Sequence, residues 1–140
     1  METSMFDEDL IAGQRLTRST RGDNRFLSFK IRLPWYRSLY LSCFDRIELS
    51  MNGQPQNEEN IFFKLNGTTY RFSELTKHHS VQWFVLDPAE LLVQHDSNLP
   101  SDQCEIALTL FFRIPYHRHV FRQVGTCARA LQLEDRIALS

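Results

Sequence analysis

Apolar and polar residues alternate with a period of two in several parts of the chain, the pattern of half-buried β-strands. Strands are therefore expected at residues 26–33, 46–52, 60–65, 68–72, 81–86, 91–95 and 104–114. Asn66-Gly67 joins two of them and predicts a type I′ hairpin, because both central residues of that turn need positive φ. The last strand is the longest, with its apolar residues on one face from Cys104 to Ile114.

The two ends of the chain follow no such pattern. Residues 1–24 are mostly polar and predict a flexible N-terminal arm, with a short edge element as the alternative. Residues 25–140 are then a single domain, which suits a chain of this length. In the C-terminal part the apolar residues are scattered, and residues 128–133 have the spacing of a short helix.

Many short strands separated by turn signals, with little helix, predict an all-β fold. The version we expect is a two-sheet antiparallel β-sandwich, jelly-roll-like. A small closed barrel is the alternative. Eleven Phe residues among 140 supply large, flat side chains for a core between facing sheets.

The composition argues against several classes of function. A net charge of −1 gives no field that would attract nucleic acid or an anionic membrane. No apolar run approaches the ~20 residues of a membrane span. The acidic first residues lack the pattern of a signal peptide, and three cysteines without paired spacing suit a reducing compartment, so we expect a cytoplasmic protein.

Trp35, Tyr36 and Arg37 stand together just after Pro34, between two predicted strands. Aromatic residues and arginine are enriched at the centres of protein interfaces, because they combine contact area with hydrogen-bond donors. They can also line a pocket for a sugar or a flavonoid. The other interpretation is that Trp35 closes one end of the sandwich as part of the core.

Adjacent aromatic residues give a second indication of a partner. In the pairs Phe62-Phe63, Trp83-Phe84 and Phe111-Phe112, one member must point away from the core. Phe111 and Arg113 share the outward face of the longest strand, and we expect them beside Phe62 and Phe84. A sheet that is apolar on both faces is covered on both, which predicts a partner subunit or self-association.

Nucleophile and metal motifs are weak. His117 and His119 alternate after the longest strand and could chelate a metal, completed by His78, His79 or His95. The neighbouring arginines disfavour a cation there, so we expect no metal in this chain. The sequence has no nucleophile-elbow motif and no phosphate-binding glycine loop. Cys43 has Arg46 nearby, but nothing else marks it as reactive.

Three pieces of sequence resemble one known family. They are RLPWYRSL at residues 32–39, WFVLDP at 83–88 and RIPY at 113–116. Through these three segments the chain resembles the small β-subunits of bacterial C-glycoside deglycosidases, over roughly residues 26–116. Tyr40 and Phe44 depart from the pattern.

The resemblance implies a β-sandwich subunit bound to a larger α-subunit with a TIM-barrel fold. The α-subunit would hold a divalent metal, usually manganese, together with the acid–base residues. The substrate would be a 3-oxo-C-glycoside whose carbon–carbon bond is cleaved by elimination. No catalytic residue of the family maps onto this chain. The side chains expected at the partner interface or closing the pocket are Trp35, Tyr36, Arg37, Phe111, Arg113 and Tyr116.

The leading hypothesis is therefore an accessory subunit in a hetero-oligomer, without catalytic residues of its own. A stand-alone carbohydrate- or flavonoid-binding module that uses Trp35 and Tyr36 is the alternative from a different class. A metal-dependent enzyme built on His117 and His119 is the third.

Overall fold

The computed structural model describes residues 2–6, 9–95, 103–115 and 121–135. Its regular structure is almost entirely β-strand, with short 3-10 helices at Leu41–Cys43, Glu58–Asn60 and Phe72–Lys77 (η1 to η3). The predicted all-β class with little helix is confirmed. No helix in these ranges is long and apolar enough to cross a membrane.

The strands build one large sheet and one small one. They are β1 (Glu2–Phe6), β2 (Ile11–Arg21), β3 (Asn24–Ile31), β4 (Leu39–Tyr40), β5 (Phe44–Met51), β6 (Gln54–Pro55), β7 (Ile61–Leu65), β8 (Thr68–Arg71), β9 (Gln82–Trp83), β10 (Ala89–Gln94), β11 (Gln103–Ile114) and β12 (Phe121–Asp135). The large sheet runs β6-β5-β11-β12-β2-β3-β10-β7-β8, with β1 also beside β12. Strands β4 and β9 form the small sheet.

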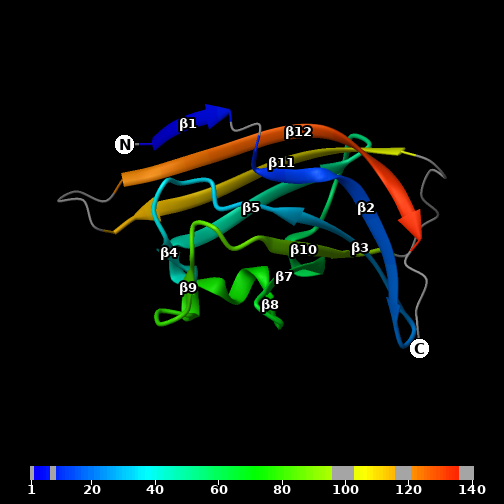
Figure 1. Ribbon diagram of the computed structural model, residues 1–140, viewed down its shortest axis with the longest axis horizontal. Helices are drawn as coiled ribbons and strands as arrows, with labels where there is room; N and C mark the ends of the chain where they lie inside the picture. The colour runs from blue at the N-terminus through cyan, green and yellow to red at the C-terminus, as the bar shows by residue number, and fades with distance from the viewer. Residues whose placement is uncertain (1, 7–8, 96–102, 116–120, 136–140) are drawn as a thin grey trace.

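The large sheet curls, so that β12, β11 and β5 form one layer over β10, β7 and β8 (Figure 1). The two layers expected of a sandwich are thus confirmed, although both come from a single sheet. Its path ends at β6 and β8 without closing, which differs from the barrel alternative. Most neighbouring strands are antiparallel, but β12 is parallel to both β1 and β2.

The segment expected as a flexible arm instead contains two strands of this sheet. Strand β2 lies between β12 and β3. Leu10, Ile11 and Leu16 are fully buried, so these three apolar residues of the polar segment belong to the core. Alternation did not reveal β2 because its register against β3 shifts between Ala12 and Thr17.

The predicted helix at residues 128–133 is wrong, since this segment lies within β12. Strand β12 pairs with the whole of β11, from Phe121 opposite Ile114 to Gln132 opposite Gln103. Long-range pairing with a regular neighbour outweighs the weak helical spacing of a segment rich in alanine. The predicted hairpin is confirmed, with φ of 50° at Asn66 and 86° at Gly67.

Large aromatic side chains join the two layers in one continuous row. Trp35 lies 6.1 Å from Phe112, Phe112 lies 5.5 Å from Phe44, and Phe44 lies 5.3 Å from Trp83. Phe63 of the opposite layer completes the row, 5.2 Å from Trp83. The row therefore starts at the loop after β3, crosses β11 and β5, and ends on β7.

The loop after β3 also determines which residue can occupy position 125 of β12. A Cβ atom placed on Gly125 would lie 2.9 Å from Cβ of Pro34. Both atoms belong to rigid parts of the chain, so the contact cannot be relieved by rotation of a side chain. Close packing of the Pro34 loop on β12 therefore requires glycine at this position.

We predict that Gly125→Ala destabilises the protein by about 1–3 kcal/mol, the usual cost of overpacking. Urea unfolding followed by tryptophan fluorescence measures this free energy. Ala128→Ser, an exposed change on the same strand, is the control and should stay within about 0.5 kcal/mol of wild type. A Gly125→Ala variant as stable as the control would show that the loop can move away from β12 at no cost.

Candidate interaction site

Trp83 determines the shape of the loop that follows it. Its side chain is fully buried between Phe44 and Phe63, although β9 ends at this residue. The indole Nε1–H donates a hydrogen bond of 2.7 Å to the carbonyl of Asp87, and the Asp87 amide donates one of 2.9 Å to the carbonyl of Phe84. The chain between them is thereby held in a tight turn, with Pro88 fixing its exit.

The small sheet holds a second loop beside this turn. Leu39 pairs with Trp83 and Tyr40 with Gln82. The Val85 amide donates a 3.0 Å hydrogen bond to Oγ of Ser38. The loop that carries Trp35, Tyr36 and Arg37 is thus attached to the 84–87 turn through both backbone and side chain.

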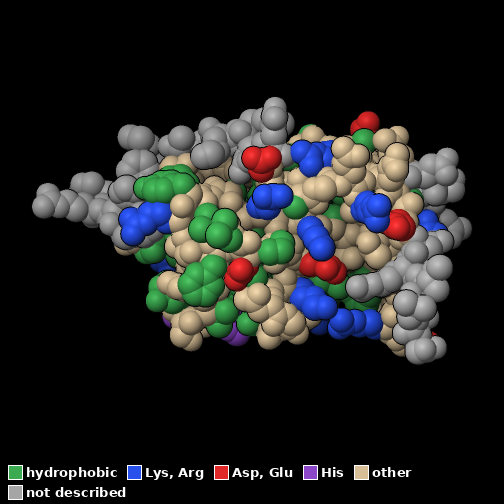
Figure 2. All heavy atoms as spheres, viewed as in Figure 1, with side chains coloured by type: hydrophobic (Ala, Val, Ile, Leu, Met, Phe, Trp, Pro, Cys, Tyr) green, Lys and Arg blue, Asp and Glu red, His purple; other side chains and the backbone are tan. Residues whose placement is uncertain are grey.

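Exposed apolar side chains gather on these two loops. Among the described residues, every large hydrophobic side chain that is exposed belongs to them or to β4. They are Tyr36 (68%), Tyr40 (41%), Phe84 (52%), Val85 (40%) and Leu86 (90%), which we call the apolar patch. Figure 2 shows hydrophobic side chains gathered over the end of the molecule where β4 and β9 lie. A concentration of this kind usually marks a binding surface rather than scattered exposure.

A groove of about 550 Å³ crosses the apolar patch, lined by Arg37, Ser38, Tyr40, Gln82, Phe84 and Val85. Two aromatic rings supply its apolar surface, while a guanidinium, an amide and a hydroxyl supply hydrogen-bond groups. This mixture suits a flat molecule that carries a few polar substituents, or an aromatic side chain of a partner.

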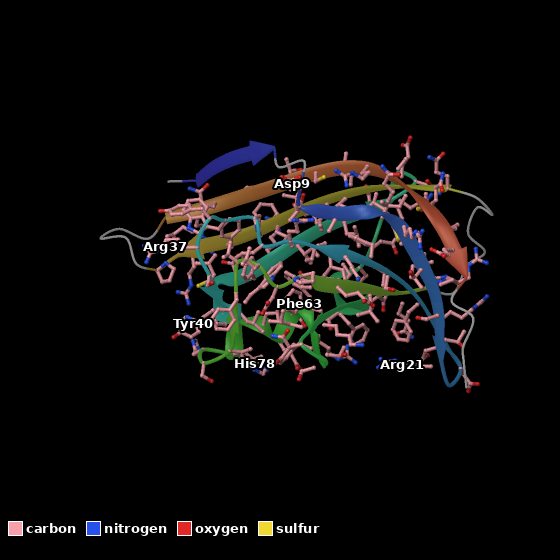
Figure 3. The ribbon with its side chains drawn as sticks, viewed as in Figure 1. Asp9, Arg21, Arg37, Tyr40, Phe63 and His78 are labelled. Carbon is pink, nitrogen blue, oxygen red and sulfur yellow. The ribbon has the colours of Figure 1, made fainter. Side chains whose placement is uncertain are left out.

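The predicted residues Trp35, Tyr36 and Arg37 divide between core and surface. Trp35 is half-buried and packs against Phe112, as the core interpretation expects. Tyr36 is exposed and lies 5.0 Å from the Trp35 ring, and Arg37 lines the groove. Figure 3 shows Arg37 and Tyr40 on the same end of the molecule. Tyr116 lies outside the described residues.

Phe111 and Arg113 lie elsewhere, on the outer face of β11. The guanidinium of Arg46 sits 4.6 Å above the Phe111 ring, and Arg46 also pairs with Glu48. Arg113 stands opposite Arg122, which forms an ion pair with Asp45. The outer face of β11 is therefore charged, and the Arg46 guanidinium covers the Phe111 ring.

The expected cluster of outward aromatic residues does not form. Phe62 lies on β7, in the layer opposite Phe111. Arg71 sits 5.3 Å above its ring and Phe26 packs edge-on against it at 5.8 Å. Of the three aromatic pairs, only Trp83-Phe84 presents an exposed ring.

Sequence reasoning missed Tyr40, Val85 and Leu86. Residues 81–86 were expected to form a strand, which would have buried alternate side chains, but the strand ends at Trp83. The Asp-Pro pair at 87–88 was the available signal, since it marks a turn directly after an apolar run.

The histidines that the structure describes do not form a metal site. His117 and His119 lie outside the described residues. His78 packs edge-on against Tyr70, with ring centroids 4.6 Å apart, and His95 lies just after β10. Nowhere in the described ranges do three His, Cys, Asp or Glu side chains converge as metal ligands would.

The cysteines are buried and reduced. Burial raises the pKa of the Cys43 thiol, more than the nearby Arg113 guanidinium lowers it. Burial likewise raises the pKa of Cys104. Both groups therefore remain neutral thiols at physiological pH, and neither has the character of an activated nucleophile.

Comparison with known proteins gives one consistent result. The family model described as C-glycoside deglycosidase beta subunit matches residues 6–116. A C-glycoside deglycosidase beta subunit of Arthrobacter globiformis is 32% identical over 92 residues, which cover 64% of this chain and 69% of that protein. One of Microbacterium trichothecenolyticum is 32% identical over 96 residues, covering 69% and 72%.

A third relative has a more specific name. The 3'-dehydrocarminate deglycosidase beta subunit of a Microbacterium species is 30% identical over 112 residues, covering 80% of this chain and 81% of that protein. The matched range includes all five residues of the apolar patch and all three pieces of sequence that suggested the resemblance. The chain belongs to the C-glycoside deglycosidase beta subunit family.

Proposed function

We propose that this chain is the accessory β-subunit of a C-glycoside deglycosidase and that it docks onto an α-subunit through the apolar patch. The observation that carries the proposal is that the exposed large hydrophobic side chains of the described residues gather on one end of the molecule. Membership in a family named for a beta subunit supports a second subunit as the occupant.

The construction of the patch suits docking. Leu86 is 90% exposed at a turn that hydrogen bonds from Trp83 and Asp87 hold in place. A backbone that is fixed before binding loses little conformational entropy when the side chain that it carries enters a pocket on a partner. Tyr36, Tyr40 and Phe84 surround this position with aromatic contact area of the kind found at interface centres.

The proposed chemistry belongs to the complex, with a TIM-barrel α-subunit as the partner. A carbon–carbon glycosidic bond has no leaving oxygen to protonate, so the two-carboxylate chemistry of ordinary glycosidases does not apply. A 3-oxo sugar has an acidified C2 proton, and loss of that proton permits elimination of the aglycone carbon. The divalent metal of this proposal, manganese, has no donor set among the described residues of this chain and is assigned to the α-subunit.

This chain would contribute to the substrate site through the groove of the apolar patch. A phenolic aglycone is flat and carries hydroxyl groups, which matches the Tyr40 and Phe84 rings and the polar groups of Arg37 and Gln82. In the complex, the groove would then form one wall of the aglycone site, at the interface with the α-subunit.

The same groove also favours a second candidate, a stand-alone module that binds flavonoids or carbohydrates. In that case the apolar patch binds the ligand, and the chain does not associate with an α-subunit. The two candidates differ in oligomeric state, which the docking experiment measures directly.

We predict that Leu86→Asp abolishes stable association with the α-subunit of the proposed complex. A buried charge at an interface anchor costs about 2 kcal/mol or more, which is roughly 30-fold in Kd. Co-expression followed by size-exclusion chromatography with mass detection measures the complex. Ala130→Asp places the same charge at an exposed position on β12 and should leave the complex intact.

Co-elution of the Leu86→Asp variant in the wild-type ratio would remove the patch as the docking surface. A wild-type chain that stays monomeric beside the α-subunit would favour the stand-alone module instead.

We predict that the purified chain alone does not cleave a 3-oxo-C-glycoside and that cleavage appears when the α-subunit is added. Release of the aglycone, followed by chromatography, is the readout for each subunit alone and for the mixture. Cleavage by the lone chain at the rate of the mixture would overturn the accessory role.

We predict that none of the three cysteines of the folded chain reacts quickly with a thiol reagent at pH 7. Burial raises the pKa of Cys43 and Cys104, so the reactive thiolate stays scarce until the pH exceeds the usual thiol range. Absorbance of the released aromatic thiolate follows the reaction, and urea-unfolded protein gives the full count. A fast-reacting thiol in the folded chain would contradict an accessory role without nucleophiles.

A further inference from the structure

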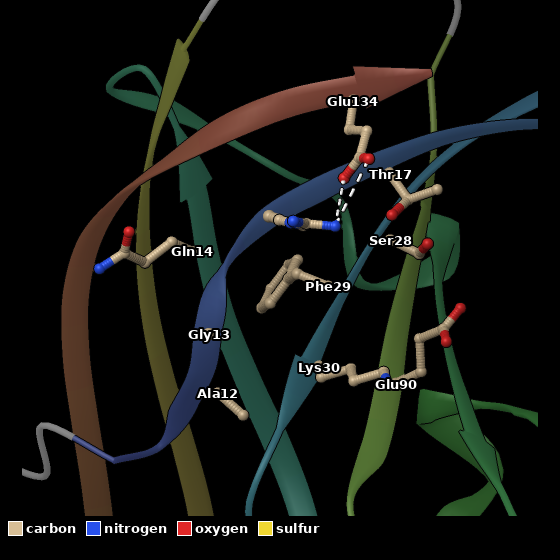
Figure 4. Close-up of a pocket in the computed structure, with 10 residues that line it drawn as sticks. Ala12, Gly13, Gln14, Thr17, Ser28, Phe29, Lys30, Glu90 and Glu134 are labelled. Carbon is tan, nitrogen blue, oxygen red and sulfur yellow. Dashed lines mark hydrogen bonds and ion pairs between the residues drawn. The ribbon is translucent and has the colours of Figure 1, made fainter. Parts of the chain in front are cut away.

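A hollow lies beside β2, where the strand loses its register. Ala12 pairs with Lys30 and Thr17 pairs with Ser28, so residues 13–16 of β2 stand opposite the single residue Phe29 of β3. The strands separate around this mismatch and leave a space of about 440 Å³ (Figure 4). We call this space the β2 hollow.

The walls of the β2 hollow are held in place on several sides. Arg129 of β12 donates hydrogen bonds of 2.7 Å and 3.0 Å to the carbonyls of Ile11 and Gly13. Gly13 has a φ of +82°, the left-handed region that glycine adopts without strain. Leu16 is fully buried and anchors the other end of the irregular segment in the core. The space is therefore preformed, as small-ligand sites usually are.

The lining of the β2 hollow is mostly polar. It consists of Ala12, Gly13, Gln14, Arg15, Thr17, Ser28, Phe29, Lys30, Glu90 and Glu134. Two hydroxyls, one amide, two cations and two carboxylates thus face a space that could hold one sugar-sized molecule. Figure 4 shows Thr17 and Ser28 near Glu134, with Lys30 and Glu90 together at the opposite end.

The balance of charges in the lining does not favour an ionic ligand. Arg15 and Glu134 form an ion pair of 3.2 Å, and Lys30 stands directly across from Glu90 in neighbouring strands. Two positive and two negative groups balance, so neither an anion nor a cation gains net attraction. The single aromatic residue of the lining, Phe29, is 2% exposed and offers no ring for stacking. A flat aromatic ligand is therefore disfavoured as well.

A neutral molecule with several hydroxyl groups remains as the matching ligand. Each hydroxyl both donates and accepts, so neighbouring hydroxyls can donate to Glu90 and accept from Lys30 at once. One polyol makes several such charge-assisted hydrogen bonds in place of several separate water molecules, whose release offsets part of the entropy cost of binding. We propose that the β2 hollow is a binding site for a neutral polyol the size of one sugar ring, separate from the apolar patch.

The test uses the full chain, labelled with nitrogen-15, and records amide resonances while D-glucose is added. We expect saturable shifts in the millimolar range at Gly13, Thr17, Ser28 and Lys30. Glu90→Gln keeps the size of the side chain and should weaken binding at least tenfold. Glu105→Gln removes an exposed carboxylate from a different depression and should leave binding unchanged. The spectra themselves show whether each variant is folded.

D-galactose and myo-inositol serve as further probes, and cyclohexanol tests the need for several hydroxyls. Absence of saturable shifts with all three polyols would overturn the site. So would shifts confined to Tyr36, Tyr40 and Phe84, equal binding by cyclohexanol, or equal losses in the two glutamine variants. Because no α-subunit is present, these outcomes are independent of the docking proposal.

Discussion

Burial of Trp83 between the two layers, with its indole N–H bound to the Asp87 carbonyl, is the interaction on which most of this structure depends. A buried tryptophan removes about 150–250 Å² from water, and its loss typically costs 3–5 kcal/mol. Domains of this size are stable by only about 5–15 kcal/mol in total. The Trp83 side chain therefore accounts for a large part of the total free energy of unfolding.

The same tryptophan connects the core to the surface. The aromatic row from Phe63 through Trp83 to Trp35 ends beside the exposed Tyr36 ring. The hydrogen bond to Asp87 forces the next three residues outward, where they form most of the apolar patch. A rigid core thus presents a rigid apolar surface, which is the arrangement that gives binding energy at a small entropic cost.

Elsewhere the molecule covers its outward aromatic rings itself. Arg46 lies over Phe111 and Arg71 over Phe62, and each arginine is also paired with a glutamate. Such contacts contribute only about 0.5–1 kcal/mol each at exposed sites, yet they leave little apolar area for unwanted association. The Phe84 ring, by contrast, is 52% exposed, and this difference distinguishes the end of the molecule with β4 and β9.

The sequence by itself determined the all-β class, the Asn66-Gly67 hairpin and the strands with clear alternation, because period-two burial and turn geometry are local properties. It also pointed to Tyr36 and Arg37 as exposed residues. Only the tertiary structure decided that residues 11–21 and 121–135 join the sheet, since their parallel pairing links opposite ends of the chain. The outward turn at residues 84–86 likewise follows from where the Trp83 ring is buried, which no local pattern records. The irregular register of β2, and with it the hollow, depends on hydrogen bonds from Arg129 on a strand more than a hundred residues away.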